Sequence, residues 1–139
     1  MAQQTNNKNT LKESWIVEGL DEEAIVFAEN FAQEIVKGEM TKSQFRNFYG
    51  EVKRIQFAAL ESNHQSFLML KPKLAYATKR SNKPGPKRFF EEMTKALDSV
   101  NALAKGDEKR TEKMHARFQN FCDLLEAILA YHKFHGGKN

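Results

Sequence analysis

Two Glu-x-x-His pairs are the residues of this 139-residue chain whose spacing most resembles a metal site. Glu61 precedes His64, and Glu112 precedes His115, by the interval with which helical bundles hold paired metal ions in their interior. The helical angles oppose that chemistry, because His115 lies about 80° and Glu112 about 140° from the centre of the nearest apolar stripe. The additional inward carboxylates of such a centre are also missing from the other apolar stripes. We therefore predict no metal site and no other cofactor.

Other patterns that would indicate an enzyme do not occur. The sequence contains no P-loop signature, no GxGxxG, no GxSxG and no HExxH. Cys122 lies beside an apolar stripe and is expected to be a small buried side chain rather than a nucleophile. As the single cysteine, it cannot form an internal disulfide, which is typical of a reducing, cytoplasmic location. His132 and His135 are expected to face solvent, and we predict a protein that is not an enzyme.

Charge is distributed unevenly along the chain. The segment Glu18–Glu39 holds seven acids and one base, a net charge of −6, whereas Lys71–Arg88 holds seven bases and no acid, a net charge of +7. The whole chain carries only +4. A concentrated basic segment on a folded domain favours a polyanionic partner. The alternative interpretation is a solvated surface whose lysines serve only solubility.

A second group of bases falls on one side of an expected helix. Lys42, Arg46 and Lys53 lie within about 40° of one another, with Tyr49 beside them, and roughly 110° from the apolar face. Their long stems can lie along the protein while the charged heads reach phosphates. No motif for reading bases is present, so contact with a sugar-phosphate backbone irrespective of sequence is expected. The predicted RNA-binding residues are Lys42, Arg46, Lys53, Lys71, Lys73, Lys79, Arg80, Lys83, Lys87 and Arg88.

Helices must position these side chains, because apolar residues recur at helical spacing and no adequate strand alternation is present. Asp21 is a predicted N-cap, and Thr41 with Gln44 forms a predicted capping box. Pro72 is expected to lie in the first turn of a new helix, after a turn or short helix. The expected helices span residues 10–17, 21–38, 41–62, a region before about residue 80, 86–104 and 108–134, with a loop over 81–86. The sequence therefore predicts an all-α fold, a compact bundle of about five helices with short loops.

Length and composition define the organisation of this bundle. Hydrophobic residues make up 40% and charged residues 29%, which excludes wholesale disorder, and the length suits one domain. We expect a flexible tail over residues 1–9, a single helical-bundle domain over 10–135 and a flexible C-terminus over 136–139. Mean hydropathy is −0.67, and no apolar run approaches the roughly 20 residues that span a bilayer. No membrane association is expected.

Three stretches carry a family resemblance. Residues 41–48, Thr-Lys-Ser-Gln-Phe-Arg-Asn-Phe, resemble the signature of the small subunit of type III-A CRISPR effector complexes, the Csm small subunit. Residues 70–80, Leu-Lys-Pro-Lys-Leu-Ala-Tyr-Ala-Thr-Lys-Arg, are similar to that family's Leu-x-Pro-Lys-Leu-x-Tyr-Ala-x-x-Arg segment. Residues 118–131, which begin Phe-Gln-Asn-Phe and end Glu-Ala-Ile-Leu-Ala-Tyr, are similar to its C-terminal helix. The three stretches occur in the family's order.

The resemblance implies a non-catalytic subunit for antiviral defence that stacks along the guide RNA–target RNA duplex and contacts its backbone. Its implied partners are guide RNA, target RNA, other subunits of the effector complex and further copies of itself. It places Arg46 and Arg80 among the RNA-facing positions, with the neighbouring lysines beside them. We also hypothesise that the acidic segment 18–39 meets a basic surface on a neighbouring subunit. The alternative function is a standalone helical adaptor whose basic patch binds an acidic protein.

Overall fold

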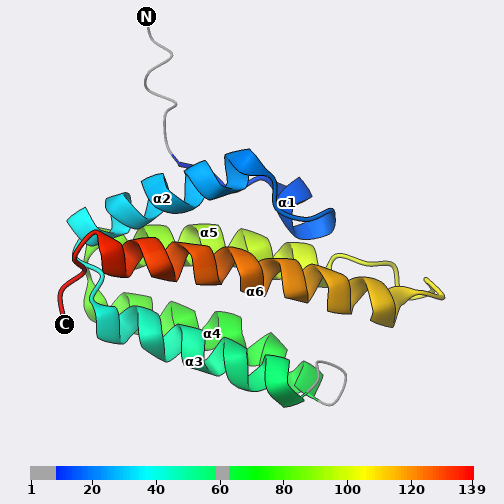
Figure 1. The fold of residues 1–139 in the computed structure, drawn as a ribbon. Coiled ribbons are helices and arrows are strands. Elements are labelled where there is room, and N and C mark those ends of the chain that lie inside the picture. Colours follow the sequence, from blue (N-terminus) through cyan, green and yellow to red (C-terminus); the bar gives the residue numbers. More distant parts are fainter. Residues whose placement is uncertain (1–8, 59–62) are drawn as a thin grey trace, which may run out of the picture.

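Six α-helices and no strand make up the secondary structure of the part of the chain that the computed structural model describes, residues 9–58 and 63–139 (Figure 1). The helices are α1 (Glu13–Val17), α2 (Glu22–Lys37), α3 (Lys42–Ala58), α4 (His64–Ser81), α5 (Pro84–Asn101) and α6 (Arg110–Phe134). This confirms the predicted all-α fold, with five long helices and one short one. Residues 1–8 of the predicted N-terminal tail lie outside the described residues, as do residues 59–62.

Side-chain caps begin two of the helices where the sequence predicts them. The Oδ1 atom of Asp21 accepts a hydrogen bond from the backbone N–H of Ala24 at 2.9 Å, at the start of α2. At the start of α3, the backbone N–H of Thr41 donates to Gln44 Oε1 at 2.8 Å, and that of Gln44 donates to Thr41 Oγ1 at 3.1 Å. These bonds satisfy amide groups that no helical carbonyl can reach. Both predicted caps are therefore confirmed.

Helix α6 lies at the centre of the molecule, with α1 and α2 on one side of it and the α3–α4 pair on the other (Figure 1). Helix α5 packs against α1, α2, α4 and α6. Phenylalanine side chains join the layers: Phe45 of α3 lies 4.9 Å from Phe89 of α5, and Phe48 meets Phe121 of α6 edge to face. The predicted apolar stripes are thus buried in one continuous core, which gives the charged helix flanks a rigid base.

Helix α4 runs through Pro72 without a break, so the predicted start of a new helix at this proline is wrong. A proline inside a helix removes one backbone hydrogen bond. Phe67, Leu70 and Leu74 nevertheless form one buried stripe on both sides of it. Pro72 itself is exposed on the solvent side. Burial of that continuous stripe against α3 and α5 outweighs the local cost, because tertiary packing supplies most helix stability.

The connection from α4 to α5 is shorter than predicted. Only Asn82 and Lys83 separate the two helices, and Asn82 adopts the left-handed conformation with φ 56°. Helix α5 then begins against the end of α2, where the Gly85 N–H donates to the Gly38 carbonyl at 2.7 Å. A Cβ atom at Gly85 would lie 2.5 Å from the Ile35 carbonyl oxygen. The glycine pair therefore permits a close backbone approach that fixes the position of the α5 N-terminus.

The prediction that His132 and His135 face solvent is wrong. His132 is completely buried, and its Nε2–H donates to the Met40 carbonyl at 2.9 Å. The chain turns back after α6, and the Gly137 N–H donates to the His132 carbonyl. Gly137 thereby packs against the imidazole ring of His132. His135 is mostly covered and lies 3.1 Å from Glu29. Burial lowers the pKa of His132 below its ordinary value, although the bond to Met40 opposes this.

Cys122 is buried in α6, as predicted. Burial raises the pKa of its thiol to about 12, because a thiolate would lose its hydration there. A thiol held in its neutral form is a poor nucleophile. Its environment is that of a small packed side chain.

Candidate nucleic-acid interface

Six of the predicted cations come together at one end of the bundle, where α3 begins, α4 ends and α5 begins (the left side of Figure 1). We call this set the basic end. The basic end consists of Lys42, Arg46, Lys79, Arg80, Lys83 and Lys87. The contact between Gly38 and Gly85, and a hydrogen bond from the Lys42 N–H to the Lys138 carbonyl, fix this end of the fold. Residues 45 positions apart in the sequence thereby occupy one region.

Three lysines of the basic end line a groove of about 490 Å³ between α4 and α5. Lys79 lies at the end of α4, Lys83 precedes α5, and Lys87 follows in its first turns. Lys83 approaches Glu39 only to 3.8 Å, in an exposed pair. Lys79 and Lys87 form no ion pair within the described chain. Three exposed ammonium groups around one groove are suited to hold a phosphate.

A second groove, of about 430 Å³, lies between α3 and α4. Its lining includes Arg80 and Lys73, above an apolar floor that contains Phe48 and Phe89. The Arg80 guanidinium lies 5.7 Å from the centre of the Tyr76 ring, while Lys73 is 3.5 Å from Glu51. The exposed Arg80 group thus lies near an aromatic ring and forms no ion pair in the described chain, which suits a contact with a phosphate oxygen.

The basic residues of α3 lie on its other flank, toward α6. Lys53 acts electrostatically on Cys122 of α6, and its ammonium lies 5.9 Å from the centre of the Tyr49 ring. Arg46, a member of the basic end, is exposed on the same flank about two turns before Lys53. The predicted cations therefore do not form one flat patch. They surround the end of the α3–α4 pair on two flanks.

Three predicted lysines form exposed ion pairs with carboxylates of neighbouring helices or turns. Lys71 of α4 is 2.8 Å from Asp98 of α5, and Lys73 and Lys83 form the longer contacts already described. Exposed pairs of this kind contribute only about 0–1 kcal/mol. A phosphate can therefore compete for these lysines at a small energetic cost. Lys71 and Lys73 nevertheless lie in the middle of α4, about two turns before the basic end.

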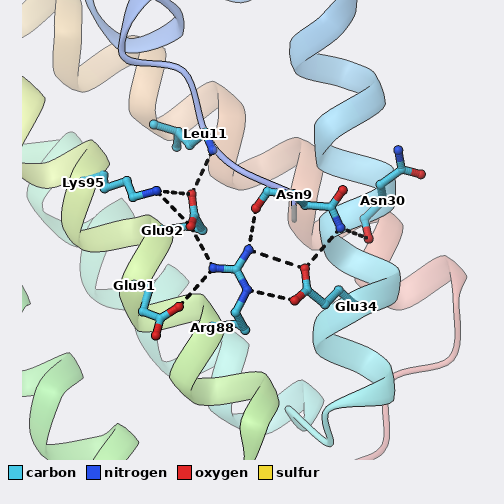
Figure 2. A network of polar contacts seen from close by, with 8 residues as sticks. All are labelled: Asn9, Leu11, Asn30, Glu34, Arg88, Glu91, Glu92 and Lys95. Atoms are coloured by element: carbon cyan, nitrogen blue, oxygen red, sulfur yellow. Dashed lines mark hydrogen bonds and ion pairs between the residues drawn. The ribbon is translucent and has the colours of Figure 1, made fainter. Parts of the chain in front are cut away.

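Arg88 has a different environment from the other predicted cations. Its side chain is only 13% exposed and lies among carboxylates of two helices (Figure 2). Its Nε–H donates to Glu34 of α2 at 2.8 Å, and its Nη1 donates to Glu92 at 2.8 Å and Glu91 at 3.1 Å. Its Nη2 donates to the Asn9 carbonyl and, at 3.5 Å, to Glu34. All five guanidinium donors are thereby used within the chain.

Electrostatics at this cluster favour the charged forms. Burial alone would oppose the charge of Arg88, but the hydrogen bonds to Glu34, Glu92 and Glu91 outweigh it and raise the pKa above the ordinary value. Burial would likewise raise the pKa of Glu92, yet bonds from the Leu11 N–H, Arg88 and Lys95 lower it. The cluster joins the N-terminal segment, α2 and α5. We therefore withdraw Arg88 from the predicted RNA-binding set and assign it a structural role.

Acids of the segment 18–39 are partly used inside the molecule as well. Glu34 binds Arg88, Glu23 lies 2.6 Å from Lys12, and Glu29 faces His135. These contacts leave fewer acids of α2 for the hypothesised contact with a neighbouring subunit. That contact stays a prediction, carried chiefly by exposed acids such as Glu22.

Within residues 9–58 and 63–139, no group of three or more His, Cys, Asp or Glu side chains is placed to hold a metal ion. Glu61, one member of the Glu-x-x-His pairs, lies outside the described residues. None of the described helices is long and apolar enough to cross a bilayer.

Sequence reasoning did not single out one exposed aromatic side chain beside the predicted cations of α3. Phe57, near the end of α3, is 87% exposed and lies 6.0 Å from the Lys53 ammonium. The helical angle of Phe57 places it near the basic flank of α3, and this angle could have drawn attention to it from the sequence alone.

Comparison with known protein families gives one match. Residues 21–138 match the family model described as Csm2 Type III-A. No curated protein sequence and no solved structure matches the chain significantly. The match covers α2 to α6 and includes every residue of the basic end.

Proposed function

The chain belongs to the Csm2 family, the small subunits of type III-A CRISPR effector complexes, and from that premise we propose that its basic end binds the sugar-phosphate backbone of RNA. Csm2 proteins are generally non-catalytic structural subunits, so the remaining subunits of the Csm complex and RNA are the expected partners. The RNA would be the guide RNA–target RNA duplex along which copies of the subunit stack. The finer assignment concerns which side chains meet the phosphates.

The observation that carries this proposal is the convergence of six cations from α3, α4 and α5 at one end of the fold. Lys42, Arg46, Lys79, Arg80 and Lys87 form no ion pair with any carboxylate in the described chain. Cations without internal partners repel one another and attract polyanions. Phosphate contacts of this kind position a nucleic acid without reading its sequence. Such contacts suffice where a guide strand supplies the sequence information by base pairing.

A standalone adaptor that binds an acidic protein is the second candidate, because the same cations would attract a cluster of carboxylates. Membership of the Csm2 family favours RNA. Gentle purification of the tagged protein from its native cells separates the two functions. The effector subunit should bring down a guide RNA and the other Csm subunits, whereas an adaptor should bring down one acidic protein and no RNA.

A double charge reversal tests the RNA contact in the assembled complex. Arg46→Glu with Arg80→Glu should weaken capture of target RNA by about tenfold or more at low salt, because each reversal replaces an attraction to phosphate by a repulsion. Both side chains are exposed and bind no carboxylate in the described chain, so the fold should remain stable.

Arg54→Glu provides the matched control. Arg54 also lies on α3 and is 66% exposed, but it pairs with Glu51, away from the flank that carries Arg46 and Lys53. Capture should be close to that of the wild type in this variant. Target capture that is equal in the wild type and the double variant would contradict the proposal.

A further inference from the structure

Phe57 is the most exposed large apolar side chain among the described residues, at 87%. Most other phenylalanines of the chain are buried in the core. A single exposed apolar side chain is ordinary on a protein surface, so its exposure alone indicates no partner. What distinguishes Phe57 is the set of side chains that lie beside it on α3.

Phe57 completes a straight stripe along α3. Successive members of the stripe are three or four positions apart, which places them on one side of the helix over roughly 22 Å of its length. The stripe consists of Lys42, Arg46, Tyr49, Lys53 and Phe57. Two cations come first, a ring, a cation and a second ring follow, and the stripe contains no acid. Its first two members belong to the basic end, so the stripe extends the RNA contact surface along α3.

Lys53 links the two rings of the stripe. Its ammonium lies 5.9 Å from the centre of the Tyr49 ring and 6.0 Å from that of Phe57. Both distances are within the range of a cation–π contact. Helical spacing places the two rings on one face of α3, and Lys53 provides a positive charge close to both. Tyr49 is packed partly against the core, while Phe57 projects into solvent.

Carboxylates of α6 do not neutralise this stripe. Asp123 and Glu126 are the acids of α6 that act on Cys122 together with Lys53. Neither forms an ion pair with Lys53 in the described chain; Asp123 accepts a hydrogen bond from Gln119 instead. The stripe therefore keeps its positive charge, which suits a polyanion and disfavours an uncharged apolar protein face.

We propose that this stripe binds a single-stranded segment of RNA, with the backbone along its cations and an unpaired base stacked on Phe57. The inference rests on the proposed backbone contact and adds a base-binding position to it. Alternating positive charges and exposed rings are the means by which proteins bind single strands irrespective of sequence. Every base has a flat π-face, so the contact adds affinity without selecting a sequence.

The test compares two short single strands of equal charge, an oligouridylate and a ribose-phosphate strand of the same length without bases. The full-length protein at low salt should bind the oligouridylate about tenfold more tightly, roughly 1.4 kcal/mol, which is within the range for one stacked base. Phe57→Leu keeps an apolar side chain but removes the ring, and it should abolish the difference. Phe57→Trp should preserve it.

Phe134→Leu is the matched control, since Phe134 is 77% exposed on α6 and lies off the stripe. This variant should discriminate between the two strands as well as the wild type does. Thermal unfolding should be similar in all of these variants, because both rings are exposed.

Two results would overturn the inference while leaving the backbone contact intact. One is equal binding of the two strands by the wild type, with binding still weakened by Arg46→Glu. The other is unchanged strand discrimination in Phe57→Leu together with loss of another Csm subunit on co-purification, which would make Phe57 a protein contact. Failure of the wild type to bind either strand would overturn both the stripe and the proposed function.

Discussion

Arg80 and Arg88 are eight positions apart in the same acid-free stretch of sequence, yet the structure gives them opposite environments. Arg88 lies among Glu34, Glu91 and Glu92 and uses all its donors inside the molecule (Figure 2). Arg80 is exposed, its guanidinium lies near the Tyr76 ring, and it forms no ion pair in the described chain. A charge count along the sequence treats the two residues alike. Only the partners that the fold brings to each one separate a structural arginine from one that is free to bind.

The difference has an energetic basis. A charge that is removed from water must find carboxylates and hydrogen bonds, and its deletion leaves those partners buried and unpaired. An exposed charge retains its hydration and contributes little to stability, so it remains available to a ligand. The predictions below exploit this contrast, beginning with the largest expected effect.

Replacement of each arginine by methionine is the direct comparison. Arg88→Met should destabilise the protein by about 1–3 kcal/mol, because the Glu92 carboxylate, whose side chain is only 2% exposed, would keep Lys95 and the Leu11 N–H but lose its bond to Arg88. Arg80→Met should change stability by no more than about 0.5 kcal/mol. Urea unfolding of the two variants measures both values. Equal stability of the two variants would refute the structural role assigned to Arg88.

The close approach of α2 and α5 can be tested at the glycines. Gly85→Ala should destabilise the fold by about 1–3 kcal/mol, because its Cβ would lie 2.5 Å from the Ile35 carbonyl and force the helices apart. This change should also loosen the arrangement of Lys83 and Lys87 at the basic end. Gly50→Ala, at a helical position with open space around it, should stabilise by about 0.5–1 kcal/mol. A Gly85→Ala protein as stable as the wild type would show that this contact does not hold the basic end.

Low pH should reduce the stability that the buried charged and titratable groups contribute, whereas the exposed cations should be unaffected. His132 has a lowered pKa when folded, so the unfolded chain takes up its proton first and stability declines as the pH falls below about 6.5. Glu92 also has a lowered pKa, so its contribution is complete above about pH 4.5 and is lost below it. Urea midpoints across this range should therefore fall in two steps.

His132→Gln isolates the first of these steps. The glutamine amide can still donate to the Met40 carbonyl but does not titrate, so the decline near pH 6.5 should disappear while the decline below pH 4.5 remains. The same decline in the variant as in the wild type would assign it to another group.

Much of the fold follows from local sequence signals. The Asp21 cap and the Thr41–Gln44 capping box were predictable because their hydrogen bonds join residues three positions apart. The apolar stripes were predictable for the same reason, since one helical period decides which face is buried. The interruption at Pro72 was predicted wrongly because tertiary packing outweighs the local preference of proline.

The surroundings of individual site residues were harder to predict from the sequence, because the wrong predictions concern side chains whose partners are distant in the chain. Arg88 meets Glu34 across 54 positions, and only its neighbours Glu91 and Glu92 gave a local hint. His132 is covered by the turn at Gly137 and binds Met40 across 92 positions. His132 does lie seven positions after Leu125, so helical spacing places it on the apolar stripe of α6, and its burial could have been predicted from that spacing. By contrast, the clustering of Lys79, Lys83 and Lys87 follows from their proximity in sequence.

The salt dependence of RNA binding tests the central claim most directly. The affinity of the assembled Csm complex for target RNA should be measured over a series of salt concentrations, with the wild type and with Lys79, Lys83 and Lys87 all changed to glutamine. If these lysines neutralise RNA phosphates, the slope of log affinity against log salt should become shallower by about 2 in the variant, at about 0.7 per lost contact. An unchanged slope in a variant that still assembles would contradict the claim that the basic end holds the RNA backbone.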